Sequence, residues 1–300
     1  MTETSNPPNP TDSSRQPQQA ILYLILALAL VRGLIYLSVV PPWQAPDEPA
    51  HFERAKAALN ATDWASTSEN SPAWYGELRD SLIQFDFLDY TLRSATAGPE
   101  APLSNFIDLY QEVYGGLYGS RPTYAVIGWP LLLAPGQEVV LQLYLLRLGT
   151  VAMNLVILYL AYLTTRLIFP NNEFLSLGVT LLILFNPQHT HMLSTVNNGN
   201  LTELLAVITL YFVARGLRHG FSLATILVMG GSALAAMWTK ATGYFLIIPL
   251  ATIGLFYLWE YRRRWPYLLG GGLAVGIVLF FFRPARLAVL AAEGWNFSHG

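Results

Sequence analysis

Long apolar segments separated by polar ones run through most of this 300-residue chain. The first, 20–40, reaches the roughly 20 residues that a helix needs to cross a bilayer. Six more candidate spans follow, several of them near or below the lower length limit: 139–167, 174–187 (which can extend to His191), 201–213, 221–238, 244–259 and 267–282. The pattern predicts an all-α, polytopic membrane protein with about seven transmembrane helices.

Both ends of the chain differ from this pattern. Residues 1–19 are rich in Pro, Ser, Asn and Gln, which predicts a disordered, cytoplasmic N-terminus. They do not read as a cleaved signal peptide, because the only base is Arg15 and no small-residue cleavage site follows Val40. We expect residues 20–283 to form the membrane module. Residues 284–300 would be an outside tail, and they resemble the start of a further, truncated loop.

The segment 41–123 is too long for a simple connection, and long loops usually carry function. Residues 51–60 have helical composition, with Phe52, Ala55 and Ala58 toward one face. This favours a helix that lies along the membrane surface.

The rest of this region is less regular. Residues 74–92 are a second amphipathic candidate, whereas 105–118 are aromatic and Gly-rich and predict irregular structure. Residues 124–135 are apolar but too short to cross, and they include Pro130 and Pro135. We interpret them as a re-entrant or interfacial piece.

Composition agrees with a membrane protein. The chain is 53% hydrophobic and 12% charged, with a mean hydropathy of +0.38. A net charge of −2 gives no signal of nucleic-acid binding. Cysteine is absent from the sequence, which excludes disulfides and thiolate metal sites.

Basic residues predict the topology. They occupy alternate short loops, which are cytoplasmic in most membrane proteins: Arg166, then Arg215 and Arg218, then Arg262, Arg263 and Arg264. With a cytoplasmic N-terminus, 41–123 then lies outside in a protein of the cytoplasmic membrane. The charge balance agrees, because this loop holds 12 of the 19 acidic residues and only five of the 17 basic ones.

Three titratable residues follow the first span directly, in the run Pro-Asp-Glu-Pro-Ala-His-Phe at 46–52. Asp47 can act as a general base if it partly loses water at the interface. The alternative is that it only caps the helix that follows. His51 stands four residues later and can share a helix face with Asp47. Glu48 alone would usually be a solvated charge.

Three cations lie near the outer ends of predicted spans: Arg32, Arg147 and Lys240. Charges at membrane depth are costly, and together with the nearby carboxylates they favour an anionic ligand such as a lipid phosphate. The alternative is that they extend toward the lipid headgroups, above all Lys240.

A polar elbow, 186–200, connects two short spans on the same side. It can form a hydrogen-bonding wall for a polyol or a phosphate, with Asn197 and Asn198 as candidate ligands. The alternative is an ordinary Asn/Gly turn that caps the next helix. The i,i+2 spacing of His189 and His191 is poor for joint metal binding on a helix.

The run P-D-E-P-A-H-F after the first span resembles a family of predicted bacterial membrane proteins of unassigned function related to the GT-C glycosyltransferases. Within that superfamily it is similar to the protein O-mannosyltransferases and the aminoarabinose transferases, which carry an acidic pair in the first extracytoplasmic loop. Weaker agreement comes from 144–148, 194–197 and Thr239-Lys240. The resemblance covers 20–283, but Asn198-Gly199 stands where an acidic residue is expected.

The resemblance implies a transferase that takes a sugar from a polyprenyl-phosphate donor in a single displacement with inversion. Asp47 would be the base, Glu48 and His51 would orient the acceptor or the sugar, and Lys240 would hold the donor phosphate. Further substrate-binding candidates are Arg147, Arg32, Asn197, Asn198 and Arg121.

The expected partners are the lipid bilayer, the lipid-phosphate sugar, and a glycan or protein acceptor. A cationic pocket can stabilise a departing phosphate without a metal, so no cofactor is required, although a divalent cation stays open. The competing class is a transporter or lipid-binding membrane protein without chemistry.

Overall fold

The computed structural model describes residues 10–60, 72–91, 93–114, 121–133, 136 and 138–260. This part of the chain is helical and contains no strand, which confirms the all-α prediction. The chain divides into two compact units, Met1–Tyr244 and Phe245–Gly300. Every candidate site residue lies in the first unit.

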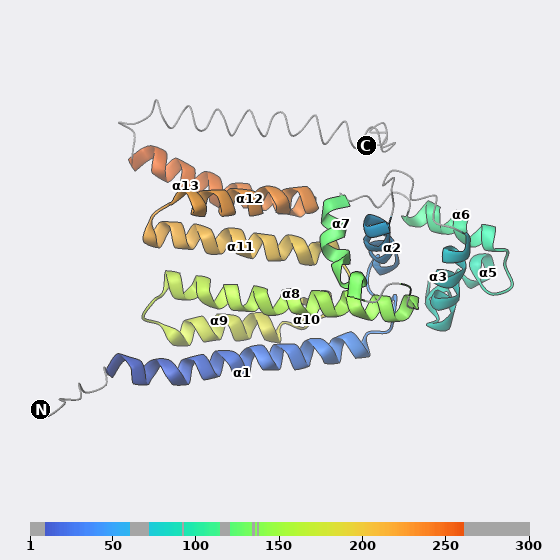
Figure 1. Cartoon of the computed structure of the whole chain (residues 1–300), viewed down its shortest axis with the longest axis horizontal. Coiled ribbons are helices and arrows are strands. Elements are labelled where there is room, and N and C mark those ends of the chain that lie inside the picture. The colour runs from blue at the N-terminus through green and yellow to red at the C-terminus, as the bar shows by residue number, and fades with distance from the viewer. Residues whose placement is uncertain are drawn as a thin grey trace, which may run out of the picture. The chain divides into compact units, whose positions relative to one another are not determined.

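Five helices of the first unit lie side by side (Figure 1): α1 (Pro10–Val39), α8 (Val139–Ile168), α9 (Glu173–Phe185), α11 (Asn198–His219) and α12 (Leu223–Thr239). Helix α8 packs against α1, α9 and α11, and α12 packs against α11. Large apolar side chains such as Leu24 and Leu182 are exposed on these helices, as expected for surfaces that face lipid.

Among the described residues, three helices are long and apolar enough to cross a membrane: Gln19–Val39, Val139–Ile168 and Asn198–His219. The arrangement of seven spans is therefore not confirmed. Helix α9 has 13 residues, about 20 Å at 1.5 Å per residue, against a hydrocarbon core of about 30 Å. It ends before Asn186-Pro187, because a residue that precedes proline disfavours helical geometry. A short helix, α10 (Pro187–Met192), follows.

Helix α1 begins at Pro10, so it includes part of the polar segment that the sequence predicts to be disordered. The division between the units falls within η3 (Ala241–Leu246), and α13 (Ile247–Glu260) belongs to the second unit. The predicted span 267–282, the three arginines at 262–264 and the tail 284–300 lie outside the described residues.

The segment between α1 and α8 folds into short helices at one end of the five-helix layer (Figure 1): α2 (Glu48–Asn60), α3 (Pro72–Gln84), α4 (Phe87–Tyr90), α5 (Ser94–Ala97), α6 (Leu103–Tyr114), α7 (Arg121–Gly128) and η2 (Trp129–Leu133). We call residues 41–133 the cap. One hydrophobic core joins the cap to α8, for example Phe52 and Leu78 to Leu143. Helix α6 replaces the irregular structure expected over most of 105–118.

Helix α2 is largely buried within the cap. Phe52, Ala55 and Ala58 are buried, as the pattern predicts, but Glu53 and Arg54 on other faces are buried as well. Helix α7 packs so closely that a Cβ on Gly128 would lie 2.7 Å from the Ala55 carbonyl oxygen. Most of α2 is therefore covered by the rest of the cap, and Lys56 and Leu59 stay partly exposed. The interfacial position stays a prediction.

The opposite end of the layer carries the basic residues of the predicted cytoplasmic side. Arg166 is in the last turn of α8 and Arg218 is in the last turn of α11. These helix ends lie far from the cap in Figure 1. The arrangement agrees with a topology in which the cap and the basic ends face opposite sides of a membrane.

Candidate functional site

The segment after α1 turns sharply twice before α2 begins. Trp43 (φ 71°) and Asp47 (φ 56°) both have left-handed backbone geometry. For a bulky residue such as Trp43 this conformation costs on the order of 1–3 kcal/mol and persists only where the surroundings hold it. Two contacts hold it here. The Trp43 indole Nε1 donates to Ser81 Oγ at 2.8 Å, and its ring meets Phe52 edge-on at 5.3 Å.

The second carboxylate of the motif is buried in an ion pair. Arg147 Nε donates to Glu48 Oε1 at 2.9 Å, and Arg147 Nη2 donates to Glu48 Oε2 at 2.6 Å. Both side chains are 0% exposed. The same oxygens accept backbone N–H groups from Val196 at 3.0 Å and from Trp43 at 3.1 Å. The Glu48 carboxylate therefore joins the cap, α8 and the polar elbow.

Arg147 uses its remaining donors on the end of α1. Its Nη1 reaches the carbonyl oxygens of Leu37 and Val40 at 3.2 and 2.7 Å, and its Nη2 reaches that of Pro41 at 3.0 Å. All five guanidinium N–H groups are thus occupied. The structure corrects both expected roles: with no exposed surface and all donors engaged, neither Glu48 nor Arg147 can contact a substrate in this arrangement.

Asp47 has the opposite environment. It is exposed, and no described residue donates a hydrogen bond to its carboxylate. Its carbonyl oxygen accepts the His51 N–H at 3.0 Å, which starts α2. A helix N-cap residue usually has extended backbone geometry and a side chain that accepts from the first turn. Asp47 has neither feature, so side-chain capping does not account for this residue.

His51 is buried one helical turn after Asp47. Its Nδ1 lies 2.7 Å from the Tyr124 hydroxyl of α7. Burial, with a smaller contribution from the Lys240 charge, lowers the pKa of His51 from 6.5 to about 4. The imidazole is therefore neutral at pH 7. Burial also raises the pKa of Tyr124; Arg54 opposes this shift and Asp47 adds to it, so Tyr124 keeps its proton.

Lys240 follows α12 and lies at the same end of the layer. Its side chain is half-buried, and no carboxylate among the described residues forms an ion pair with it. A Cβ on Gly199 would lie 3.6 Å from Lys240 Nζ and 2.8 Å from Asn197 Oδ1. Glycine at 199 therefore leaves space between the ammonium group and the start of α11.

These contacts define a site made of Asp47, His51, Tyr124, Lys240 and Asn197. The Asp47 carboxylate and the Lys240 ammonium both act electrostatically on the hydrogen-bonded His51–Tyr124 pair. Thr123 Oγ1 donates to Thr239 Oγ1 at 3.4 Å and connects α7 to the residue before Lys240. The site therefore contains an exposed carboxylate, a neutral imidazole and a cation without a counter-ion among the described residues.

The polar elbow serves first as a pair of helix caps. Asn186 Oδ1 accepts from the first turn of α10, and Asn197 Oδ1 accepts the Gly199 N–H at 2.6 Å at the start of α11. This is the alternative that the Asn/Gly pattern left open. Asn198 is buried, and its Oδ1 has no partner within the described structure. His189 pairs with Glu203 at 2.8 Å.

Two predicted cations are engaged in contacts of other kinds. Arg32 lies over the rings of Tyr36 and Phe185, at 5.5 and 5.4 Å, and so connects α1 to α9. Arg121 Nε donates to the Ala58 carbonyl oxygen at 3.2 Å and connects α7 to α2.

Sequence reasoning missed Tyr124 and Trp43. Tyr124 opens an apolar stretch that has no pattern of its own, and only its distance from His51 identifies it. Trp43 lies three residues before the motif, and its strained backbone has no signal in the sequence, where glycine would be the usual sign of positive φ.

Comparison of the chain with protein-family models, with curated proteins and with solved structures finds no match. The relation to the GT-C glycosyltransferases therefore rests on the P-D-E-P-A-H-F motif and its setting after the first span.

Proposed function

We propose that this protein is a membrane glycosyltransferase of the GT-C kind that transfers a sugar from a polyprenyl-phosphate donor to an extracytoplasmic acceptor. One observation carries the proposal: a half-buried Lys240 ammonium acts on a neutral His51 at the cap end of apolar helices, and an exposed Asp47 carboxylate stands one helical turn before that imidazole. A base and a phosphate-binding cation are the two groups that this reaction needs. Helices long enough to span a membrane give a lipid-linked donor access to them.

In the proposed reaction the Asp47 carboxylate accepts the proton of an acceptor hydroxyl. The hydroxyl oxygen attacks the anomeric carbon, and the bond from that carbon to the phosphate oxygen breaks with its electron pair on the phosphate. Lys240 stabilises the charge that develops on the departing polyprenyl phosphate. The product is a glycoside of inverted configuration. With Tyr124 donating to Nδ1, the His51 Nε2–H remains to orient a sugar or acceptor hydroxyl.

The proposed location is the cytoplasmic membrane, with the cap outside. The absence of native cysteine makes this accessible to labelling. Ser94→Cys on the exposed α5 should react with an impermeant thiol reagent on intact cells. His219→Cys at the end of α11 should react only after permeabilisation. The reverse pattern would place the site on the cytoplasmic side and remove the argument for an extracytoplasmic acceptor.

Activity tests the function directly. Purified protein in detergent should transfer sugar from one of a set of polyprenyl-phosphate sugars, and Asp47→Asn should lower transfer by roughly 10²–10⁴, the range for loss of a general base. Glu112→Gln, which alters an exposed acid on α6, is the matched control. Transfer with and without EDTA settles whether a divalent cation takes part. Donor binding without transfer by any donor would favour the lipid-binding or transporter class instead.

A further inference from the structure

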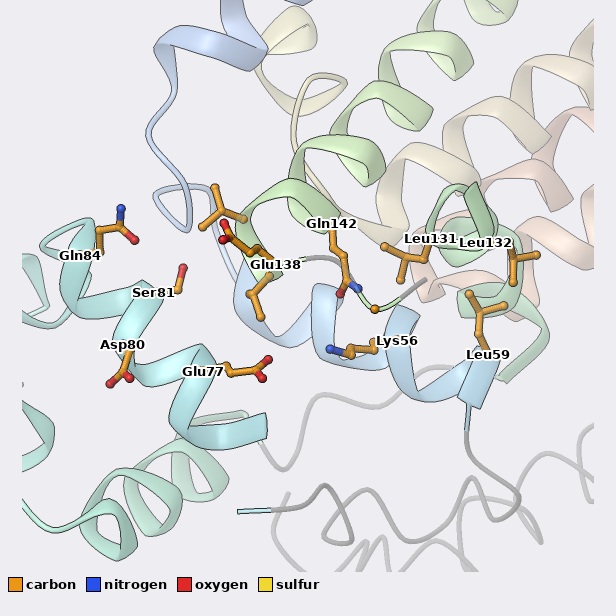
Figure 2. Close-up of a pocket in the computed structure, with 13 residues that line it drawn as sticks. Lys56, Leu59, Glu77, Asp80, Ser81, Gln84, Leu131, Leu132, Glu138 and Gln142 are labelled. Carbon is orange, nitrogen blue, oxygen red and sulfur yellow. The ribbon is translucent and has the colours of Figure 1, made fainter. Parts of the chain in front are cut away.

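A pocket lies between the cap and the start of α8, and its lining includes none of Asp47, His51 and Lys240. Its volume is about 910 Å³, and its walls come from α2, α3, η2 and the start of α8 (Figure 2). Polar residues line one part of it: Lys56, Glu77, Asp80, Ser81, Gln84, Glu138 and Gln142. Apolar residues line the rest: Leu59, Leu131, Leu132, Val139 and Val140.

Gln142 is the most informative residue of this pocket. Its side chain is 5% exposed, and its Oε1 has no hydrogen-bond partner among the described residues. In Figure 2 it extends from α8 into the space between α2 and α3, toward Lys56. A buried carbonyl oxygen without a donor costs about 1–3 kcal/mol. A ligand that donates a hydrogen bond would satisfy it.

The charged residues that line the pocket indicate the charge of that ligand. Three carboxylates line it, from Glu77, Asp80 and Glu138, against one cation, Lys56. Lys56 already has local partners: its ammonium lies 5.8 Å from the Trp74 ring centre and interacts electrostatically with Glu77. Asp80 also has a partner, because its Oδ1 lies 3.6 Å from Arg79 Nε. Glu138 is therefore the lining carboxylate that no described cation pairs, and together with the unsatisfied acceptor it favours a cation with N–H donors.

A single metal ion fits this lining poorly. No three acidic or histidine side chains among the described residues come close enough together to hold one. The acids are spread around the pocket, and apolar side chains lie between η2 and the start of α8. An organic cation fits both features, because its ammonium N–H groups reach separated acceptors while its carbon body covers the leucines and valines.

We propose that this pocket binds a small organic cation, a primary ammonium on a short carbon body, with an ammonium N–H donated to Gln142 Oε1. Glu138 supplies the compensating charge. The binding is independent of glycosyl transfer, since it uses no residue of the Asp47 site. A free aliphatic diamine and an amino sugar both carry this chemistry.

Calorimetric titration of the full chain in detergent at pH 7 and low salt tests the proposal. The probes are putrescine and glucosamine, and their neutral counterparts are 1,4-butanediol and glucose. We expect saturable binding of at least one amine and none of its neutral counterpart. Comparison of putrescine with glucosamine shows whether the pocket prefers a free diamine or an amino sugar. Absence of amine binding, or equal binding of the neutral compounds, would overturn the proposal.

Variants locate the binding. Gln142→Leu should weaken amine binding about tenfold or more, which is the scale of a lost hydrogen bond to a charged group. Glu138→Gln, at an exposed position that folding tolerates, should weaken it up to about fivefold. Glu112→Gln outside the pocket and Asp47→Asn should leave it unchanged. Wild-type affinity in both Gln142→Leu and Glu138→Gln would contradict the assignment, whatever the outcome for sugar transfer.

Discussion

Asp47 and Glu48 are adjacent carboxylates in opposite environments. Glu48 is 0% exposed and accepts hydrogen bonds from Arg147, Trp43 and Val196. Asp47 is exposed, with no described donor on its carboxylate. The left-handed backbone of Asp47 turns the chain between the two and separates their side chains.

This difference separates a structural acid from a candidate catalytic one. A buried charge with complete pairing holds its partners in one geometry, and removal of one member leaves the other uncompensated. An exposed charge beside a neutral imidazole is free to exchange a proton. The two acids of the motif therefore have different roles. Glu48 stabilises the turn, and the turn leaves the Asp47 side chain exposed.

The largest effect should come from breaking the buried pair. Arg147→Leu leaves the Glu48 carboxylate buried without its counter-ion, so the free energy of unfolding should fall by about 3–5 kcal/mol. Thermal unfolding in detergent measures this. The double variant Glu48→Leu/Arg147→Leu should recover only part, because the carbonyl oxygens at the end of α1 lose their donor. Near wild-type stability of Arg147→Leu would contradict the structural role.

The stability should depend on pH through His51. Its folded pKa is about 4 against 6.5 unfolded, so the unfolded state binds more protons between these values. The free energy of unfolding is therefore unaffected by the titration of His51 above pH 6.5. It decreases as the pH falls toward 4, by at most about 3 kcal/mol. His51→Gln should flatten the slope of melting temperature between pH 7 and 4.5. An unchanged slope would show that His51 does not titrate as proposed.

Donor affinity should depend on Lys240. Lys240→Ala removes a charge-assisted contact to the donor phosphate and should weaken lipid-phosphate binding by about 1–3 kcal/mol. Lys240→Arg should retain part of the affinity. Arg218→Ala, at the opposite end of α11, is the control and should bind normally. Equal lipid-phosphate affinities for Lys240→Ala and the control would mean that Lys240 only contacts the lipid headgroups and does not bind the donor phosphate.

The smallest effect should come from Tyr124→Phe. It removes the hydroxyl that lies 2.7 Å from His51 Nδ1, and the loss of one buried hydrogen bond costs about 1 kcal/mol. The melting temperature should fall slightly, while Tyr90→Phe at an exposed position should not change it. A stability loss no greater than in the Tyr90 control would mean that the hydroxyl contributes nothing to the site.

Local pattern predicted the long elements. The apolar stretches at 20–40, 139–167 and 201–213 correspond to the three helices that are long enough to cross a membrane. The short segment 174–187 corresponds to α9, which ends at Phe185 before the Asn186-Pro187 break. Its possible extension to His191 is instead a separate short helix, α10. The helical content of 105–114 was also missed, because its aromatic residues become a helix face only against the core of the cap.

The site was predicted in part, because residue types are visible in sequence and partners are not. Lys240 acts electrostatically on His51, which follows Asp47 by one helical turn. Arg147, which pairs with Glu48 and keeps it from contacting a substrate, lies 99 positions away along the chain. Tyr124, the partner of His51, lies 73 positions away. Contacts over such separations depend on how the cap packs on α8, which no local periodicity specifies.

The most direct test of this account compares Asp47→Asn with Glu48→Gln for both sugar transfer at saturating donor and melting temperature. Asp47→Asn should keep the wild-type melting temperature while transfer falls by roughly 10²–10⁴. Glu48→Gln should lower the melting temperature strongly, because Arg147 is left buried without a counter-charge. Full transfer by Asp47→Asn, or a Glu48→Gln protein as stable as wild type, would contradict the division of roles between the two acids.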